Sequence, residues 1–329
     1  MKKSITYDSI KPKILISKCI EHDSCRYDAS MISSDFVKRI MAYVTFVTVC
    51  PEVAIGLEVP RESVRIISSK GEKSLVESLS GKDHTYKMDS FSDQYSANLS
   101  SKKIHGAILK SRSPSCGIKD VKIYPSIGRV TCLPDRSSGY FGGAVLEHNP
   151  NLAVEDEGRL KNYDIREHFL TQIFTIAHFD FMSEKLSINE LVKFHSANKY
   201  LLMAYHQLKQ KELGAIVANH SKERISVVLD KYRDNLQKAL MEPMVKGKNT
   251  NMILHMFGYV SNSLSSDEKE FFLDELSLYN QSKKPLSVIM AILHGWVIRF
   301  DVEYLKIQRI FEPYPIEILD VMDSGKGIK

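Results

Sequence analysis

The stretch VTFVTVCPE, residues 44–52, is a short apolar run that ends in a cysteine at the start of a loop. The same order of apolar run and cysteine recurs in ILISKCI, residues 14–20, and in AILKSRSPSCG, residues 107–117. Apolar runs of this length that are closed by turn residues are typical of buried strands in a parallel sheet covered on both faces. We therefore expect strands over Ile14–Ile16, Val44–Val49 and Ala107–Leu109.

Three cysteines, Cys19, Cys50 and Cys116, follow these expected strands. Ligands of open parallel sheets bind at the carboxyl ends of the strands, so the three thiols should meet at one edge of the sheet. Thiolates are soft ligands that bind iron–sulfur clusters or zinc. The alternative is that the cysteines are small buried hydrophobic residues, but the repeated order of strand and cysteine favours a ligand site.

The composition indicates a two-domain protein of a reducing compartment. The chain has 329 residues, whereas single cores stop growing near about 250 residues. The cysteine count of five is odd, and the charged start MKKSITYDSIKPK carries no apolar signal segment, so we expect a cytoplasmic protein without disulfides. No run approaches the ~18 apolar residues of a membrane span, which predicts a soluble protein. The net charge of +5 is compatible with a polyanionic partner but does not by itself indicate nucleic acid.

Up to about residue 165, the pattern predicts an α/β domain of Rossmann-like type with a mostly parallel sheet. Helical stretches alternate with the apolar runs, and we expect helices over Asp35–Val44 and within Asp89–Lys102. The stretches IKDVKIYP (118–125) and GYFGGAV (139–145) predict further sheet and a glycine-permitted turn. Residues 151–179 carry helical periodicity.

The remainder predicts an all-α domain, and we place the two domains at residues 1–180 and 181–329. Ser187 before Glu190, and Ser265 before Glu268, resemble capping boxes at helix starts. Five segments place apolar residues three and four positions apart, namely 186–206, 221–241, 249–264, 266–281 and 284–300.

Three protein thiolates leave two kinds of metal site incomplete. A structural zinc ion normally has four protein ligands, and a four-iron cluster would keep one iron without a protein ligand. Such an open iron can act as a Lewis acid or bind a soft sulfur atom. Cys25 and Cys132 are candidates for a fourth thiolate, but neither follows an expected strand.

Two further residues stand beside the expected thiol site. Glu52 in the CPE motif is either a first-turn carboxylate favoured by the helix dipole or a general acid or base. Serines in an SPSCG sequence commonly make turn hydrogen bonds. A hydroxyl three residues before a cluster ligand can also donate to a substrate, which makes Ser113 a second candidate.

Residues 13–174 resemble the bacterial thiouracil desulfidase family. The matching stretches are SKCIEHDSCRYDAS, VTVCPEVAIGLEVPRES, AILKSRSPSCGIKD and EDEGRLKNYDIREHF. The resemblance implies that Cys19, Cys50 and Cys116 bind a [4Fe-4S] cluster and that Glu52 and Ser113 assist the reaction. The first loop reads CIEHDSCRYD where many relatives have a leucine-glycine turn. Family positions to which no role is assigned are Arg26, Tyr27, Asp28, Pro60 and Arg61.

Residues 186–314 are similar to a helical domain that is often fused behind the first. Its marks are LVKFHSANKYLLMAYH, LGAIVANH, ILHMFGYV, YNQSKKPL and FEPYP. The resemblance implies an enzyme that removes sulfur from 4-thiouridine in tRNA, with the helical domain binding the RNA. Replacing a thiocarbonyl by a carbonyl is a net hydrolysis that needs no electrons. An open iron would bind the sulfur and polarise the carbon, Glu52 would deprotonate water, and Ser113 would donate to or orient the base.

Four residues are candidate RNA contacts. Lys110 and Arg112 lie beside SPSCG, to which a flipped-out base must be delivered. His195 and Lys199 are four residues apart, so they share a helix face and could contact phosphate. The alternative is that His195 is a hydrogen-bonded, half-buried histidine and Lys199 a solvated charge.

Two other functions stay open. An enzyme that acts on free thiolated bases would use the helical domain for dimerisation and would keep its activity without the residues after about 180. A non-enzymatic cluster or zinc protein that senses metal or oxygen would bind metal without releasing sulfide from any thiolated substrate.

Overall fold

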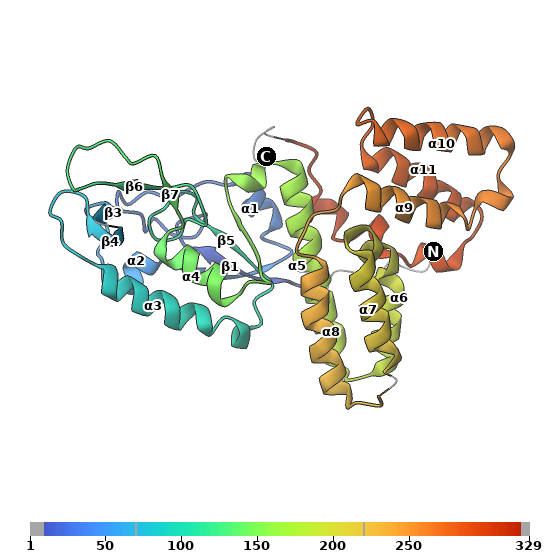
Figure 1. Cartoon of the computed structure of the whole chain (residues 1–329), viewed down its shortest axis with the longest axis horizontal. Helices are drawn as coiled ribbons and strands as arrows, with labels where there is room; N and C mark the ends of the chain where they lie inside the picture. Colours follow the sequence, from blue (N-terminus) through green and yellow to red (C-terminus); the bar gives the residue numbers. More distant parts are fainter. Residues whose placement is uncertain (1–9, 70, 220, 324–329) are drawn as a thin grey trace. The chain divides into compact units, whose positions relative to one another are not determined.

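The computed structural model describes residues 10–69, 71–219 and 221–323, and Figure 1 labels its elements. They form two compact units, residues 10–173 with 318–323 and residues 174–317. The boundary falls inside helix α5, Tyr163–Ser183. Division into separate domains at 1–180 and 181–329 stays a prediction.

A four-stranded parallel sheet runs through the first unit in the order β2-β1-β5-β8. All four residues of β5 are buried, as expected of a strand covered on both faces. The α/β class with a parallel sheet is confirmed, and so are the three strands expected before the cysteines. The strands are β1 (Lys13–Ser17), β2 (Thr45–Val49), β5 (Gly106–Leu109) and β8 (Ala153–Asp156).

Helices cover both faces of this sheet. Helices α3 (Thr85–Ala97) and α4 (Tyr140–His148) pack on the face that carries Ala107 and Leu109. Successive residues of a strand point to opposite faces, so Gly106 looks the other way. A Cβ at Gly106 would lie 2.6 Å from a methyl group of Ile173, which shows how closely α5 backs that face.

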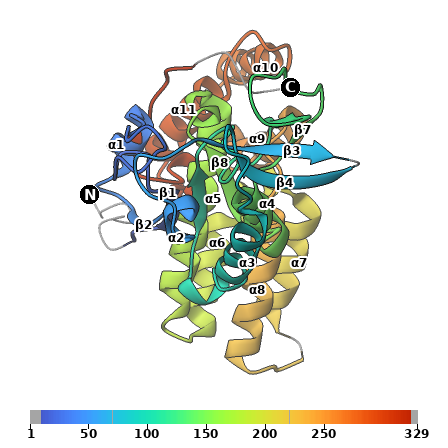
Figure 2. The same ribbon diagram turned by 90° about the vertical axis from the view of Figure 1, so that its left-hand side faces the viewer.

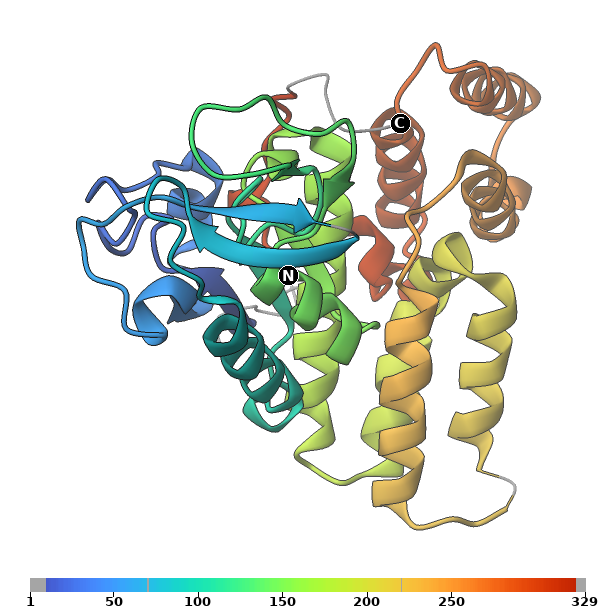
Figure 3. The same ribbon diagram turned by 60° about the vertical axis from the view of Figure 1, so that its left-hand side comes forward.

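A second, smaller sheet has the order β4-β3-β6-β7 and was not predicted as a separate sheet. Figures 2 and 3 show β3 and β4 as two long neighbouring arrows. They pair antiparallel, whereas β3 and β6 pair parallel. The strand expected within 118–125 exists, but it belongs to this sheet. The strands are β3 (Val64–Ser69), β4 (Glu72–Glu77), β6 (Val121–Tyr124) and β7 (Arg136–Ser137).

The stretch GYFGGAV begins helix α4, so the prediction of sheet and a turn there is wrong. Its glycines permit close packing against the SPSCG loop. A Cβ at Gly142 would lie 2.4 Å from the carbonyl oxygen of Gly117 and 2.5 Å from that of Cys116. A Cβ at Gly139 would lie 2.6 Å from the carbonyl oxygen of Ser115.

The same contact provides hydrogen-bond acceptors for N–H groups at the start of α4. Tyr140 N donates to the Pro114 carbonyl at 3.1 Å, and Gly142 N donates to the Ser115 carbonyl at 3.0 Å. The first N–H groups of a helix have no partner within the helix. The loop supplies those partners, and the helix in turn holds the loop in place.

The helix expected across 151–179 begins late. Strand β8 comes first, and α5 begins only at Tyr163. Asp156 ends the strand because its Oδ1 accepts from Gly158 N at 2.9 Å and from Arg159 N at 2.8 Å, which turns the chain. The two crossover helices also differ from expectation in length, since α1 covers only Asp35–Ile40 and α3 starts before the expected range.

The second unit is helical across its described residues, which confirms the predicted class. Helix α7 was not predicted, because it lies between the expected segments 186–206 and 221–241; only His206 separates it from α6. The helices after α5 are α6 (Ile188–Tyr205), α7 (Gln207–Ala218), α8 (Ile225–Ala239), α9 (Lys246–Phe257), α10 (Ser266–Asn280), α11 (Leu286–Arg299) and α12 (Glu303–Lys306).

Only one of the two expected capping boxes forms. Ser265 and Glu268 exchange both hydrogen bonds at the start of α10. Ser187 is the N-cap of α6, but its side chain makes no capping hydrogen bond. Glu190 instead accepts from Lys185 at 3.0 Å and from Lys193 at 2.7 Å, so its carboxylate is engaged elsewhere.

Residues 318–323 pack back onto the first unit. Nη2 of Arg166 donates to the carbonyl oxygens of Asp320 at 2.5 Å and Met322 at 2.6 Å. The Asp320 carboxylate also pairs with Arg39. Among the described helices, none is both long and apolar enough to cross a membrane.

We predict that Gly142→Ala destabilises the first unit by about 1–3 kcal/mol, the usual cost of overpacking. The new methyl group would press on the backbone of Gly117 and Cys116, which cannot yield without moving the loop. Thermal unfolding measures the effect. Gly143→Ala is the matched control, because its Cβ would meet mainly the rotatable hydroxyl of Ser138. Equal melting temperatures for the two variants would contradict this account of the loop.

Candidate active site

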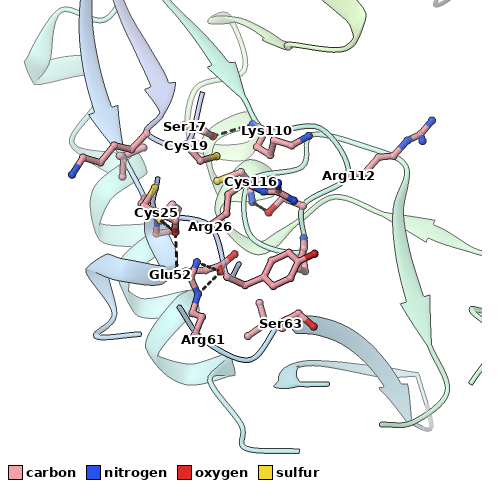
Figure 4. Close-up of a pocket in the computed structure, with 18 of the residues that line it drawn as sticks. Ser17, Cys19, Cys25, Arg26, Glu52, Arg61, Ser63, Lys110, Arg112 and Cys116 are labelled. Atoms are coloured by element: carbon pink, nitrogen blue, oxygen red, sulfur yellow. Dashed lines mark hydrogen bonds and ion pairs between the residues drawn. The ribbon is translucent and has the colours of Figure 1, made fainter. Parts of the chain in front are cut away.

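A cavity of about 260 Å³ opens where β1, β2 and β5 end, and Figure 4 shows the side chains around it. Its lining includes four cysteines, Cys19, Cys25, Cys50 and Cys116, so we call it the thiol cavity. The parallel register aligns Ile16 with Thr48 on one side and with Ile108 on the other. The loops that follow the three strands therefore meet at one edge.

Local structure fixes the position of each cysteine that follows a strand. Cys50 is the N-cap of the short helix α2 (Pro51–Ala54), with proline at the first helical position, where its missing N–H is not needed. The loop that carries Cys19 is closed by a bridge between Ile20 and Ile32. The loop around Cys116 is held by α4, as described above.

Burial keeps the thiols of Cys19, Cys25 and Cys116 protonated. It raises the pKa of Cys19 to about 12, with the neighbouring Cys50 as the next cause. Burial and then Cys50 also raise the pKa of Cys25 to about 12. The pKa of Cys116 is raised well above its ordinary value, again mainly by burial. Because thiolates are the metal-binding form, a bound metal group would displace these protons and supply the compensating positive charge.

The donor set fits an iron–sulfur cluster. Within the described part of the chain, no group of three His, Cys, Asp or Glu side chains is placed to hold a single metal ion. The ligands of a cluster bind different irons and therefore surround a volume, as the thiols around this cavity do. Ligation by Cys19, Cys50 and Cys116 stays a prediction.

Cys25 and Cys132 differ in their placement. Cys25 is buried in the lining of the thiol cavity, and Cys50 Sγ lies 4.0 Å from its carbonyl oxygen. Its position six residues after Cys19, inside one closed loop, was the available sequence signal. Cys132 is not among the residues that line the cavity.

Glu52 is held by two side chains that the sequence did not connect to it. Arg61 donates to Oε2 through Nε at 3.0 Å and through Nη2 at 2.5 Å. Ser115, which is fully buried, donates to Oε1 at 2.8 Å. The Arg61 side chain is 7% exposed and that of Glu52 14%. Paired donors of this kind fix both the place and the orientation of a carboxylate.

Ser113 shapes the loop beside this carboxylate. Its Oγ accepts from Ser115 N at 3.2 Å and from Cys116 N at 3.1 Å. The turn-forming role considered for this serine is therefore observed. A hydroxyl group also has one hydrogen to donate, and the residue lines the thiol cavity, so a role toward substrate stays a prediction.

The part of the chain that carries the thiol cavity matches a known family. Residues 14–157 match the 2-thiouracil desulfurase family. The chain is also 32% identical over 109 residues to the uncharacterized protein YbbK of Bacillus subtilis (strain 168), covering 72% of that protein and 32% of this chain. This chain belongs to the 2-thiouracil desulfurase family.

Two other matches extend the comparison. Residues 199–315 match a family described as a protein of unknown function, DUF1722. The uncharacterized protein YbgA of Escherichia coli (strain K12) is 24% identical over 158 residues, which are 47% of this chain and 93% of YbgA. The solved structure of the [4Fe-4S]-dependent thiouracil desulfidase TudS is 29% identical, covers 46% of this chain and 93% of its own, and has a TM-score of 0.38.

In this desulfurase-family chain, Lys110 forms an ion pair with the buried Glu157. Its Nζ donates to Glu157 Oε1 at 2.5 Å and to Ser111 Oγ at 2.9 Å. Glu157 is 7% exposed and also accepts from Ser111 N at 2.8 Å. This ion pair anchors the loop after β5. RNA contact by Lys110 stays a prediction, and it would compete with this pair.

Of the two residues predicted to contact RNA from this loop, Arg112 is more accessible than Lys110. Its side chain is exposed, and Figure 4 shows it directed away from the thiols. Its backbone has a φ of 56°, in the left-handed region that residues other than glycine rarely adopt. The loop thus holds a cation at the rim of the thiol cavity.

The two candidates in the helical unit are engaged with tyrosines. His195 Nδ1 lies 2.9 Å from Tyr232 Oη, and burial, followed by Lys199, lowers the pKa of His195 to about 4. The ring is therefore neutral at pH 7 and brings no charge to a phosphate. Lys199 Nζ lies 5.5 and 5.8 Å from the ring centroids of Tyr200 and Tyr304. RNA contact by either residue stays a prediction.

We predict that Arg61→Met destabilises the cluster-free chain by roughly 3 kcal/mol, because it leaves a mostly buried carboxylate without its cation. The double variant Arg61→Met/Glu52→Gln should recover much of this loss. Urea unfolding followed by circular dichroism measures the coupling, while the fluorescence of Trp296, the single tryptophan, monitors the helical unit. Strict additivity of the two single variants would contradict a direct pair.

We also predict an acid-sensitive helical unit. The pKa of His195 is lower in the folded chain than its ordinary value of 6.5, so the unfolded chain binds more protons below that pH. Stability is full above about pH 6.5 and falls as pH drops toward 4, by roughly 1–3 kcal/mol. His195→Gln should reduce the loss between pH 7.5 and 5, measured by urea unfolding with Trp296 fluorescence. The exposed His255 supplies the control, His255→Gln; equal pH dependence in both variants would refute the assignment.

Proposed function

We propose that this chain is an iron–sulfur-dependent desulfidase that converts 4-thiouridine in tRNA into uridine and hydrogen sulfide. One observation carries the proposal: three strand-end thiols and one fixed carboxylate meet in a single cavity of a chain that belongs to the 2-thiouracil desulfurase family. In this proposal Cys19, Cys50 and Cys116 hold a [4Fe-4S] cluster. When bound, the cluster would supply an iron without a protein ligand, which is a Lewis acid suited to a soft sulfur atom.

The proposed reaction is a hydrolysis without electron transfer. The oxygen of water forms a bond to the ring carbon that carries sulfur, and the carbon–sulfur bond breaks. Both protons of the water leave with the sulfur as hydrogen sulfide, and the ring keeps a carbonyl. No oxidant or reductant is consumed. The side chains of the site therefore need only to transfer protons and to orient the water molecule.

Glu52 is the group proposed to take the first proton from water. Its two oxygens accept from Ser115 and Arg61, but a carboxylate has about four lone-pair sites, so it can still accept from a water molecule. The rigid pair with Arg61 keeps the carboxylate from turning toward other donors. Ser113, on the opposite side of Pro114 from Ser115, is proposed to donate to the base or orient it.

We propose tRNA as the substrate because residues 13–174 and 186–314 together resemble two-domain tRNA desulfidases. We propose that residues 1–180 carry the chemistry and that residues 181–329 bind the tRNA. Arg112 stands at the rim of the thiol cavity, where an RNA backbone would pass if its base entered. The contacts proposed for His195 and Lys199 belong to the same hypothesis, although both side chains already pack against tyrosines.

A second candidate is the desulfuration of free thiouracil-type bases. The matching family is named for 2-thiouracil, and the solved relative TudS is named a thiouracil desulfidase. In this case the helical unit would not be needed for turnover.

The deciding experiment is anaerobic incubation of the cluster-loaded full chain with tRNA that contains 4-thiouridine, in parallel with free 2-thiouracil and 4-thiouracil. Nucleoside analysis and sulfide release are measured. We predict that Cys116→Ala loses at least about 100-fold in activity, beyond the loss typical of groups that only support a metal ligand. Cys132→Ala is the matched control and should keep both its activity and its visible cluster absorption, because Cys132 lies outside the thiol cavity.

Each outcome separates the candidates. Uridine and sulfide from tRNA, lost in Cys116→Ala, support the proposal. Sulfide from free bases alone supports the second candidate. An intact cluster with no sulfide from either substrate would refute both enzymes and favour a sensor of metal or oxygen.

A further inference from the structure

A second cavity of about 330 Å³ adjoins the thiol cavity, and the proposed chemistry does not use it. The two cavities share Ser63, Val64, Arg112 and Pro114 in their linings. A molecule that fills the thiol cavity thus has a second compartment directly beside it.

The lining of this second cavity is positively charged. Among the described residues, its lining has three cationic side chains and no carboxylate. The cations are Arg65 from β3, Lys122 from β6 and Arg112 from the loop after β5. We call this second cavity the basic cavity. None of its described lining residues is a cysteine, so it differs in chemistry from the thiol cavity. Like charges gathered on one concave surface raise the local concentration of an oppositely charged ligand.

The side chain of Arg65 is held in place by two neighbours. Its guanidinium lies over the ring of Tyr124, 4.4 Å from the centroid, and Nη1 donates to the carbonyl oxygen of Gly128 at 2.8 Å. Its Nε is buried and has no hydrogen-bond partner within the described residues. A guanidinium that is held in one plane loses little freedom when it binds a phosphate.

Arg112 joins the two compartments. It lines both cavities, and its side chain points away from the thiols. Its left-handed backbone is unfavourable for an arginine, so the loop imposes this position. A cation at this point would meet the part of a substrate that leaves the thiol cavity.

We propose that the basic cavity binds the backbone phosphate next to the nucleotide whose thiolated base occupies the thiol cavity. This inference rests on the proposed function, because it assumes a nucleotide as the substrate. A free base has no phosphate and gains nothing from Arg65, Arg112 or Lys122. The basic cavity would therefore make the site favour RNA over free bases.

Binding of a sulfur-free tRNA transcript to the full chain tests the site without any chemistry. Fluorescence anisotropy is followed as a function of salt concentration for wild type, Lys122→Ala and Lys122→Glu. Lys87→Ala, an exposed lysine on α3 outside both cavities, is the matched control. Loss of one phosphate contact should weaken binding about five-fold at 0.15 M salt and lower the slope of log affinity against log salt by about one. Lys122→Glu should weaken binding further.

Steady-state rates supply the second readout. In cluster-loaded protein, Lys122→Ala should lower kcat/KM for thiolated tRNA about five-fold more than for free 4-thiouracil. The difference arises because the variant loses one phosphate contact, which the free base does not make. A comparison with 4-thiouridine 5′-monophosphate identifies the source of the phosphate. An equal loss on the mononucleotide assigns the nucleotide's own phosphate, and a loss confined to tRNA assigns the neighbouring phosphodiester.

Unchanged affinity and salt slope in both Lys122 variants would overturn the proposal. So would an equal loss in Lys87→Ala, because binding would then reflect general positive charge. The proposed function fails separately: a chain that binds tRNA through Lys122 but releases no sulfide from 4-thiouridine keeps the phosphate site and loses the desulfidase activity.

Discussion

The parallel pairing of β1 with β2 and β5 is the constraint on which the site depends. Parallel strands end at the same edge, so three loops that lie far apart in the sequence must meet there. The pairing also buries β5 completely, so the cysteines and charged side chains beyond this strand lie on the loop that follows it. Everything proposed about the thiol cavity follows from this register, since a slip of one strand would separate Cys50 or Cys116 from Cys19.

Charge balance around the cavity explains the residues that surround the thiols. Four cysteines and two carboxylates lie in or beside the thiol cavity, and each carboxylate has its own cation. Glu52 is paired with Arg61, and Glu157 is paired with Lys110. An unpaired buried carboxylate would be costly, so these pairs hold the loops at a fixed distance from the thiols. The exposed cation Arg112 is left to face the outside of the site.

The two units of the chain differ in where they place polar side chains and how they form their cores. The first places its chemistry on loops after buried strands, and it includes residues 318–323 through Arg39 and Arg166. The second buries aromatic and aliphatic residues between helices, with Phe179 and Tyr232 stacked 5.3 Å apart. His195 and Lys199 belong to this aromatic packing more than to an open charged surface. That difference is why the basic cavity of the first unit offers the stronger structural case for contact with RNA.

Sequence alone was sufficient for the strands that precede the cysteines, the helical class of the second unit, the capping box at Ser265 and the family, because these depend on local periodicity and short motifs. It could not reveal that GYFGGAV is helical. The glycines of this stretch are needed because the helix packs closely against a loop more than twenty residues earlier in the chain. The second sheet, the burial of Cys25 beside Cys50, and the grip of Arg61 and Ser115 on Glu52 were likewise beyond sequence alone. Only the tertiary structure decided these features, because each depends on the distance between side chains that no local pattern connects.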